Sequence, residues 1–201
     1  MSMSTSQEHI TRQTFMSSIG ATAAGICGIT CTTKIANAAT SGTTASVGVK
    51  APLFELANSK GGITSLESLL QNEKYTILYF YPGAFTQGCT LEARGFQRDF
   101  EKYKALNAQI VGISVDSVEK NAQFCAEEKL DFFMLSDKGG KVSKLYGSAL
   151  SIPGFGTFSN RQTYIIAPNG ELKWVFTDVE SHVTRHSDEV LDKLEEIQKD
   201  A

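Results

Sequence analysis

The feature that most constrains the fold is an unbroken run of β-branched and aromatic residues over 75–81, with the sequence Tyr-Thr-Ile-Leu-Tyr-Phe-Tyr. A strand with one face in water alternates apolar and polar side chains, and this run does not alternate. It therefore predicts a central strand that is covered on both faces, with helices on each side of a sheet. Pro82 and Gly83 end the run.

Strand and helix patterns alternate along the rest of the chain. The first core segment is expected around Leu53, Phe54 and Leu56. Further strands are predicted over 109–115, 132–135, 163–167 and 172–176. The turn Pro168-Asn169-Gly170 joins the last two strands as a hairpin.

The predicted helices are interleaved with these strands. One begins at a capping box formed by Thr64 and Glu67, and another is opened by residues 116–119. Further helices are predicted over 89–103, up to Tyr146, and over 187–199, with an irregular glycine-rich loop after Tyr146. This order predicts an α/β fold with a mixed central sheet flanked by helices.

Length and composition indicate one folded domain. The chain has 201 residues, of which 41% are hydrophobic and 20% charged, and its net charge is -3. This length suits one sizeable core, assigned to residues 47–201. The small negative charge argues against a nucleic-acid or anionic-membrane surface, so the expected substrate is a small molecule.

Residues 1–46 differ from the rest, because they are rich in Ser, Thr, Ala and Gly. A short apolar run over 15–26 precedes Ala36-Asn37-Ala38, which has the small-x-small pattern of a signal-peptidase site. A cleaved targeting peptide followed by a linker is predicted, with a disordered, unprocessed tail as the alternative. The apolar run is too short for an integral membrane segment. Cleavage would remove Cys27 and Cys31.

Cys89 is the strongest candidate for chemistry in the domain. It follows a strand and a loop and stands in the first turn of a predicted helix, where backbone N–H groups are unpaired and the helix dipole is positive. Both effects favour the thiolate, which is the nucleophilic form of cysteine. The alternative is a small buried apolar residue, the commonest role of a free cysteine.

Pro82, Thr86 and Cys89 match the Pro-x-x-x-Thr-x-x-Cys motif of the peroxiredoxin family, and Arg161 occupies the matching downstream position at the start of a strand. The chain resembles the peroxiredoxin Q (bacterioferritin comigratory protein) subgroup from Val47 to its last helix. The subgroup likeness is carried by Phe80-Tyr81, Gly88-Cys89-Thr90, Glu92, Leu135-Ser136-Asp137 and Tyr146-Gly147. This resemblance implies a thioredoxin fold.

The resemblance also implies a thiol peroxidase that needs no metal or organic cofactor. Cys89 would attack hydrogen peroxide or an organic hydroperoxide and become a sulfenic acid. Arg161 and the Thr86 hydroxyl would hold the thiolate and the peroxide, and Pro82 would shape the pocket. Without the resemblance, Arg161 would be a surface charge and Thr86 a turn residue. Glu92 would be favourable in the first turn of any helix.

The sequence departs from the subgroup after Cys89. Many members have a second cysteine five residues later, where this chain has Arg94, so that local disulfide cannot form. Gln87 replaces a common proline, with little expected consequence. A subset of the subgroup carries its resolving cysteine on the next helix, which implies that role for Cys125. Alternatively, Cys125 is a small core residue on one helical face with Ala122.

The expected partner is a thioredoxin-like reductant, and the expected state is a monomer. A one-cysteine peroxidase that uses an external thiol, or a non-catalytic redox sensor, is the alternative. His182 and His186 are expected to be exposed, and no zinc site is predicted because the domain has no Cys-x-x-Cys. The N-terminal pattern and the resemblance together favour a plastid, in the thylakoid lumen, over a bacterial periplasm or the cytosol.

Overall fold

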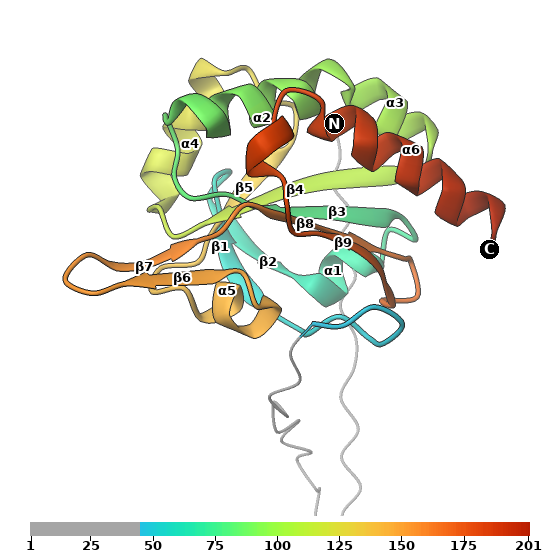
Figure 1. Ribbon diagram of the computed structural model, residues 1–201, viewed down its shortest axis with the longest axis horizontal. Helices are drawn as coiled ribbons and strands as arrows, with labels where there is room; N and C mark the ends of the chain where they lie inside the picture. The colour runs from blue at the N-terminus through green and yellow to red at the C-terminus, as the bar shows by residue number, and fades with distance from the viewer. Residues whose placement is uncertain (1–44) are drawn as a thin grey trace, which may run out of the picture. The chain divides into compact units, whose positions relative to one another are not determined.

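The computed structural model describes residues 45–201. The predictions for residues 1–44, including the targeting peptide, Cys27 and Cys31, lie outside the described residues. A sheet of seven strands, in the order β2-β1-β5-β4-β3-β8-β9, forms the centre of this region (Figure 1). Its strands are β1 (Glu55–Asn58), β2 (Gly62–Ser65), β3 (Tyr75–Phe80), β4 (Ala108–Ser114), β5 (Phe133–Ser136), β8 (Gln162–Ile166) and β9 (Leu172–Phe176).

β3 lies inside the sheet, as its sequence predicts. It pairs parallel with β4 and antiparallel with β8, and every residue after Tyr75 in the strand is buried. β5 pairs parallel with β4, so β3, β4 and β5 form the parallel part of the sheet. All other strand pairs of this sheet are antiparallel, and they involve β1, β2, β8 and β9. The predicted mixed sheet and the hairpin across residues 168–170 are therefore confirmed.

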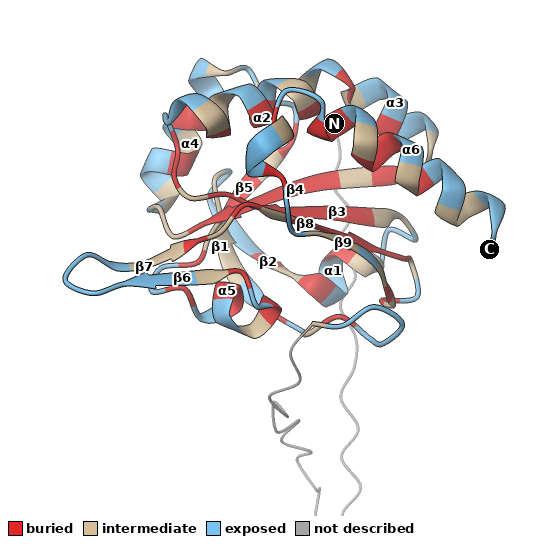
Figure 2. Ribbon diagram, viewed as in Figure 1, coloured by how far each residue is buried: buried red, intermediate tan, exposed pale blue. Residues whose placement is uncertain are grey.

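Helices cover both faces of the sheet (Figure 1). On one face lie α2 (Gln87–Arg98), α3 (Phe100–Ala105), α4 (Val118–Glu127) and α6 (His186–Lys199). On the other face lie α1 (Leu66–Leu70) and α5 (Lys141–Tyr146). Figure 2 shows buried residues on the strands and on the helix sides that face them. Neighbouring residues of β3 point to opposite faces of the sheet and belong to different hydrophobic cores. Tyr79 packs against α2 on one face, and Phe80 packs against α5 on the other.

The first helix begins one residue later than predicted. Ser65, not Thr64, is the N-cap of α1, since its backbone is extended and its hydroxyl accepts the Ser68 N–H at 3.1 Å. Ser68 completes the capping box in place of Glu67, because its hydroxyl accepts the Ser65 N–H. Thr64 is instead a buried residue of β2.

Two further predictions are corrected by the structure. The helix predicted over 89–103 is broken at Asp99, whose backbone leaves the helical conformation at the end of α2 and the start of α3. The predicted irregular loop after Tyr146 contains a separate hairpin of β6 (Ala149–Ile152) and β7 (Gly156–Ser159). None of the helices within residues 45–201 has the length and apolar character needed to cross a membrane.

Candidate functional site

Cys89 lies in the first turn of α2, on the side of the helix that faces the sheet. Thr86 is the N-cap, with an extended backbone, and α2 begins at Gln87. The Cys89 side chain belongs to the apolar core between α2 and the sheet and is 1% exposed. Its position combines both sequence-based interpretations, since it is a core residue that also lies at the positive end of a helix.

Arg161 is the residue immediately before β8, and its side chain reaches Cys89. It is 6% exposed, so it is not the surface charge that its strand context alone suggests. Its Nη2 lies 3.5 Å from the Cys89 Sγ. A Cβ on Gly88 would lie only 3.0 Å from this Nη2, so the glycine leaves room for the guanidinium. Two elements far apart in the sequence thus bring a permanent cation to the thiol.

Two carboxylates fix the Arg161 guanidinium. Its Nη1 donates to Glu92 Oε2 at 2.5 Å, and its Nε donates to Glu180 Oε2 at 2.8 Å. Glu92 comes from α2, whereas Glu180 begins the short 3-10 helix η1 (Glu180–His182). Each of the three guanidinium nitrogens therefore contacts a different side chain. These contacts fix the orientation of the guanidinium plane toward Cys89.

Burial sets the charge of Glu92. It is 1% exposed, and within residues 45–201 its Oε1 makes no hydrogen bond. Burial raises the pKa of Glu92 to about 7, against the opposing influence of Arg161. For Arg161, burial acts against the charged form, but the charges of Glu92 and Cys89 outweigh it and raise the pKa. Glu92 can therefore exchange a proton near neutral pH while Arg161 stays charged.

The loop between β3 and α2 carries the two remaining predicted site residues. Pro82 is half-buried and directly follows Tyr81 at the end of the sheet. Thr86 is exposed, and its hydroxyl donates to the Gly83 carbonyl at 3.2 Å. Among the hydrogen bonds of residues 45–201, none joins Thr86 to Cys89. The structure thus brings Arg161 to the thiol and leaves the Thr86 hydroxyl on the loop.

Asp116 holds the loop before Cys89, a role that the sequence analysis missed because it predicted only a helix start at this residue. Ser117 is the N-cap of α4, and Asp116 Oδ2 instead accepts the Ala84 N–H at 2.7 Å. That contact holds a loop in which Phe85 adopts the left-handed backbone region, with a φ of 68°. The signal was available, because β3 and β4 are parallel neighbours whose carboxyl ends meet at one sheet edge.

Cys125 lies on α4 and is a free thiol, as is Cys89. It is half-buried and packs against the core that contains Cys89. Its Sγ lies 3.5 Å from the Ser59 hydroxyl. Burial raises the pKa of Cys125, so the thiol form is favoured at neutral pH.

The prediction that His182 and His186 are exposed is wrong. His186 is the first residue of α6 and is fully buried, with its ring against Phe96 and Phe176. Its Nε2 bonds to Thr163 Oγ1 on β8 at 2.8 Å. His182 is partly buried. Burial lowers the pKa of His186 to about 3, so its imidazole is neutral. Glu180 was also missed, since only tertiary structure brings it to Arg161.

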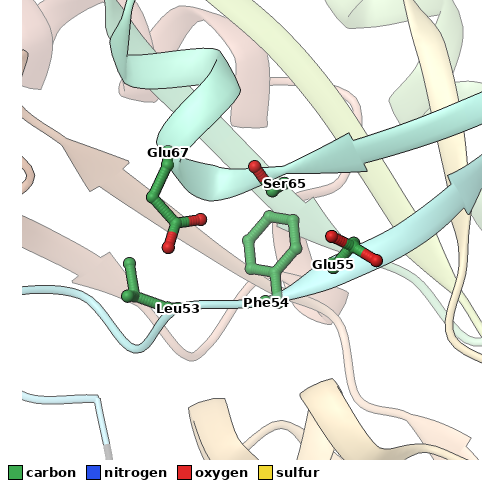
Figure 3. A pocket seen from close by; sticks show the side chains of 5 residues that line it. All are labelled: Leu53, Phe54, Glu55, Ser65 and Glu67. Atoms are coloured by element: carbon green, nitrogen blue, oxygen red, sulfur yellow. The ribbon is translucent and has the colours of Figure 1, made fainter. Parts of the chain in front are cut away.

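A shallow hollow elsewhere contains none of these residues. It is lined by Leu53, Phe54, Glu55, Ser65 and Glu67 (Figure 3). The two carboxylates turn toward it from β1 and α1. Its lining includes no cysteine, histidine, lysine or arginine, and none of the residues around Cys89 belongs to it.

Comparisons with known sequences and with solved structures agree on the family to which this chain is similar. The family model described as the AhpC/TSA family matches residues 47–175. A chloroplastic peroxiredoxin Q from Sedum lineare is 37% identical over 146 residues, which are 73% of this chain and 76% of that protein. Further plant relatives named peroxiredoxin Q, at 33–36% identity, are matched over 57–69% of their own length.

Two solved structures are similar to the described region. Peroxidoxin BcpB from Mycobacterium tuberculosis has a TM-score of 0.70 at 32% identity, covering 75% of this chain and 97% of that one. The Xanthomonas campestris bacterioferritin comigratory protein, whose structural description concerns alkyl peroxide reduction, has a TM-score of 0.64 at 26% identity. That match covers 71% of this chain and 90% of the other. The predicted thioredoxin fold of the peroxiredoxin type is thereby confirmed.

Proposed function

Because this chain belongs to the AhpC/TSA family of thiol peroxidases and matches its peroxiredoxin Q members, we propose that Cys89 is the peroxide-reducing thiolate. The observation that carries the proposal is the 3.5 Å contact between Arg161 Nη2 and Cys89 Sγ, inside a buried charged cluster. Arg161 already pairs with two carboxylates and still directs a third nitrogen at the sulfur, and a cation beside a thiol favours the thiolate.

In the first step, the Cys89 thiolate attacks one peroxide oxygen. An S–O bond forms as the O–O bond breaks, and the leaving oxygen departs as hydroxide or alkoxide and takes up a proton. Sulfur is oxidised to sulfenic acid, and the peroxide is reduced to water or an alcohol. Arg161 and the backbone N–H groups at the start of α2 stabilise the negative charge that gathers on the leaving oxygen.

The loop residues position the substrate in this proposal. The Thr86 hydroxyl donates to Gly83 in the described state, which leaves its lone pairs to accept a hydrogen bond from a bound hydroperoxide. Pro82 has no N–H and a fixed φ, so it shapes the loop without offering a competing donor. Organic hydroperoxides are proposed as substrates beside hydrogen peroxide, as the Xanthomonas relative's description suggests.

Recycling completes the proposed cycle. The Cys125 thiol attacks the Cys89 sulfur, forming a disulfide and releasing water, and a thioredoxin-like dithiol then reduces this disulfide. Two observations support this role for Cys125, namely its place against the core that holds Cys89 and its free thiol. We propose that the enzyme acts as a monomer, which light scattering of the reduced protein tests. An external thiol as direct reductant is the alternative that the disulfide experiment below distinguishes.

The location is part of the same proposal. The plant relatives named above are chloroplastic, which supports a plastid location. The pattern Ala36-Asn37-Ala38 supports export to the thylakoid lumen, with a short linker before the folded domain of residues 47–201. Mass spectrometry of the mature protein should then place its N-terminus near Ala39. Full-length protein in the cytosol would contradict this location.

Replacing Cys89 with serine tests the central claim. Cys89→Ser should abolish thioredoxin-dependent peroxide consumption while leaving the fold intact, because an alcohol does not ionise to a nucleophile at neutral pH. Consumption is measured as NADPH oxidation in the presence of thioredoxin and its reductase, and the fold by circular dichroism. Substantial turnover in a folded Cys89→Ser variant would remove Cys89 from the chemistry.

A further inference from the structure

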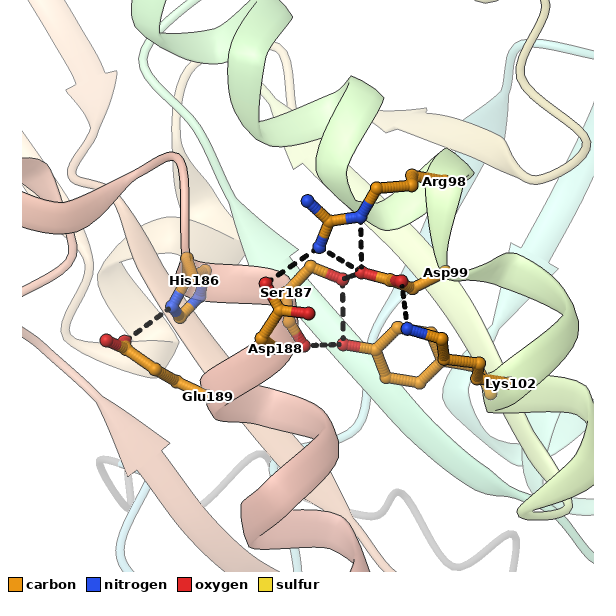
Figure 4. Close-up of polar contacts among 8 residues, drawn as sticks. Arg98, Asp99, Lys102, His186, Ser187, Asp188 and Glu189 are labelled. Carbon is orange, nitrogen blue, oxygen red and sulfur yellow. Dashed lines mark hydrogen bonds and ion pairs between the residues drawn. The ribbon is translucent and has the colours of Figure 1, made fainter.

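Three potential metal ligands converge where η1 meets α6. His182 Nδ1, His186 Nδ1 and a carboxylate oxygen of Glu189 all lie within 4.8 Å of one another. Glu189 Oε2 lies 2.7 Å from the His182 nitrogen and 3.9 Å from the His186 nitrogen. His186 and Glu189 are three residues apart on α6 and therefore share one helical face, whereas His182 comes from η1. Figure 4 shows His186 and Glu189 turned toward each other.

One of the two imidazoles directs an unused nitrogen at this point. Within residues 45–201, the buried Nδ1 of His186 makes no hydrogen bond, although buried polar atoms nearly always do, whereas the Nδ1 of His182 pairs with Glu189 Oε2 at 2.7 Å. His186 is fully buried, so bulk solvent does not reach its ring. Its unpartnered Nδ1 lies 3.9 Å from Glu189 Oε2, which is too far for a hydrogen bond but close enough for both atoms to bind one ion.

His186 is already held in the form that binds metals. Its Nε2 bonds to the Thr163 hydroxyl at 2.8 Å, which orients the ring and, with the proton on Nε2, leaves the Nδ1 lone pair free. Metal-bound histidines characteristically use their second nitrogen in this way. Edge contacts with Phe96 and Phe176 hold the ring on both sides.

We propose that His182, His186 and Glu189 form a binding site for one Zn²⁺ ion, with water as the fourth ligand. Two imidazoles and a carboxylate suit zinc, whereas Mg²⁺ and Ca²⁺ prefer oxygen ligands alone. Zinc bonds of about 2.0–2.2 Å place tetrahedral ligand atoms about 3.3 Å apart, between the 2.7 and 3.9 Å separations observed. Small side-chain adjustments therefore suffice to close the site.

The surroundings allow a cation to enter. The side chains of His182 and Glu189 are 25% and 32% exposed, so solvent reaches the site on their side. Arg185 lies 3.9 Å from the other oxygen of Glu189, Oε1, and leaves Oε2 directed at the histidines. The positive charge of nearby Arg161 is offset by its two carboxylate partners, Glu92 and Glu180. This inference is independent of the peroxidase chemistry, because no proposed ligand contacts Cys89.

Calorimetric titration of the reduced full-length chain with Zn²⁺ tests the site. Wild type should bind one more zinc ion per chain than Glu189→Gln, which keeps the side-chain shape but loses the charge. His182→Gln should show the same loss. Affinity at this site should fall by more than about 100-fold in each variant, because loss of even an outer-shell partner weakens metal sites 10–100-fold. Glu195→Gln, on the exposed part of α6, is the matched control and should bind like wild type.

Thermal unfolding provides a second measurement. Zn²⁺ should raise the Tm of wild type and Glu195→Gln, because a ligand that binds only the folded state stabilises it. The same Zn²⁺ should raise the Tm of His182→Gln and Glu189→Gln by a smaller amount. Equal zinc stoichiometry, affinity and Tm shift in all four proteins would overturn the site, as would a wild type that binds no zinc. Far-UV circular dichroism checks that each variant is folded.

Discussion

Arg161 directs its N–H groups to three different side chains, and each group has a fixed direction in the plane of the guanidinium. The neighbouring Gly88 leaves the space that this plane needs. Glu92, with a pKa raised to about 7 by burial, adds a proton-exchanging group to the same cluster. A single side chain thus links α2, η1 and the start of β8 at the thiol.

Replacing Arg161 with lysine should therefore slow the first step. Arg161→Lys is expected to lower the second-order rate constant with hydrogen peroxide by roughly 10–100-fold, the equivalent of about 1.5–3 kcal/mol for a lost charged hydrogen bond. Stopped-flow oxidation of the reduced protein measures it. Arg94→Lys is the control, because Arg94 is exposed on α2 and pairs with Glu128 away from the thiol. An unchanged rate in Arg161→Lys would refute its proposed role.

Helices α2 and α4 each contribute one of the two free thiols of residues 45–201, and the contacts between these helices limit how the thiols can meet. The Arg94–Glu128 pair fastens the middle of α2 to the end of α4, and Gln97 donates to Asp131 just beyond α4. The first turn of α2, with Cys89, lies outside these contacts. A disulfide requires Cα atoms within about 7 Å. If the two Cα atoms lie farther apart than this in the reduced protein, we expect the first turn of α2 and part of α4 to unwind as the disulfide forms.

Peptide mapping after one equivalent of peroxide should accordingly find a Cys89–Cys125 crosslink. Cys125→Ser should keep the rate of the first oxidation and lose thioredoxin-dependent turnover, because only the resolving step is removed. The control is Cys125→Ser reduced with a small external thiol, which should still turn over. Detection of Cys89 sulfenic acid alone, or of a dimer linked through Cys89, would favour the one-cysteine mechanism.

Asp99 joins three helices of the described domain. Its buried carboxylate receives hydrogen bonds from Arg98, Lys102 and Ser187, where α2, α3 and α6 meet (Figure 4). Burial opposes ionisation, but these hydrogen bonds prevail and lower the pKa of Asp99 from 3.8 to about 2. A depressed pKa means that the ionised group stabilises the fold above about pH 4. This contribution is lost as the pH falls toward 2.

Asp99→Asn should lower the free energy of unfolding at pH 7 by about 1–2 kcal/mol, after allowance for the solvent exposure of Arg98 and Lys102. The variant should also lack the part of the acid destabilisation that wild type shows between about pH 4 and pH 2. Urea unfolding across this pH range measures both. Asp192→Asn, exposed on the same α6, is the control. Equal pH profiles for Asp99→Asn and wild type would contradict the assignment.

Local patterns in the sequence predicted the central elements of the scaffold. The run over 75–81 predicted β3 at the centre of the sheet, and Pro168-Asn169-Gly170 predicted the β8–β9 hairpin. The placement of Cys89 in the first turn of α2 was also predictable, because strand, loop and helix adjoin along the chain. These features depend on residues within one or two turns of each other, so periodicity and turn chemistry describe them well.

The tertiary structure alone decided which distant side chains meet. Glu180 beside Arg161, the break at Asp99 and the burial of His186 all depend on contacts between elements far apart in the chain. No local pattern encodes such contacts, because they follow from the packing of helices against a twisted sheet. The sequence by itself therefore determined the buried strand β3, the β8–β9 hairpin and the position of the thiol, while packing decided the strand order and the charges and imidazoles around the thiol.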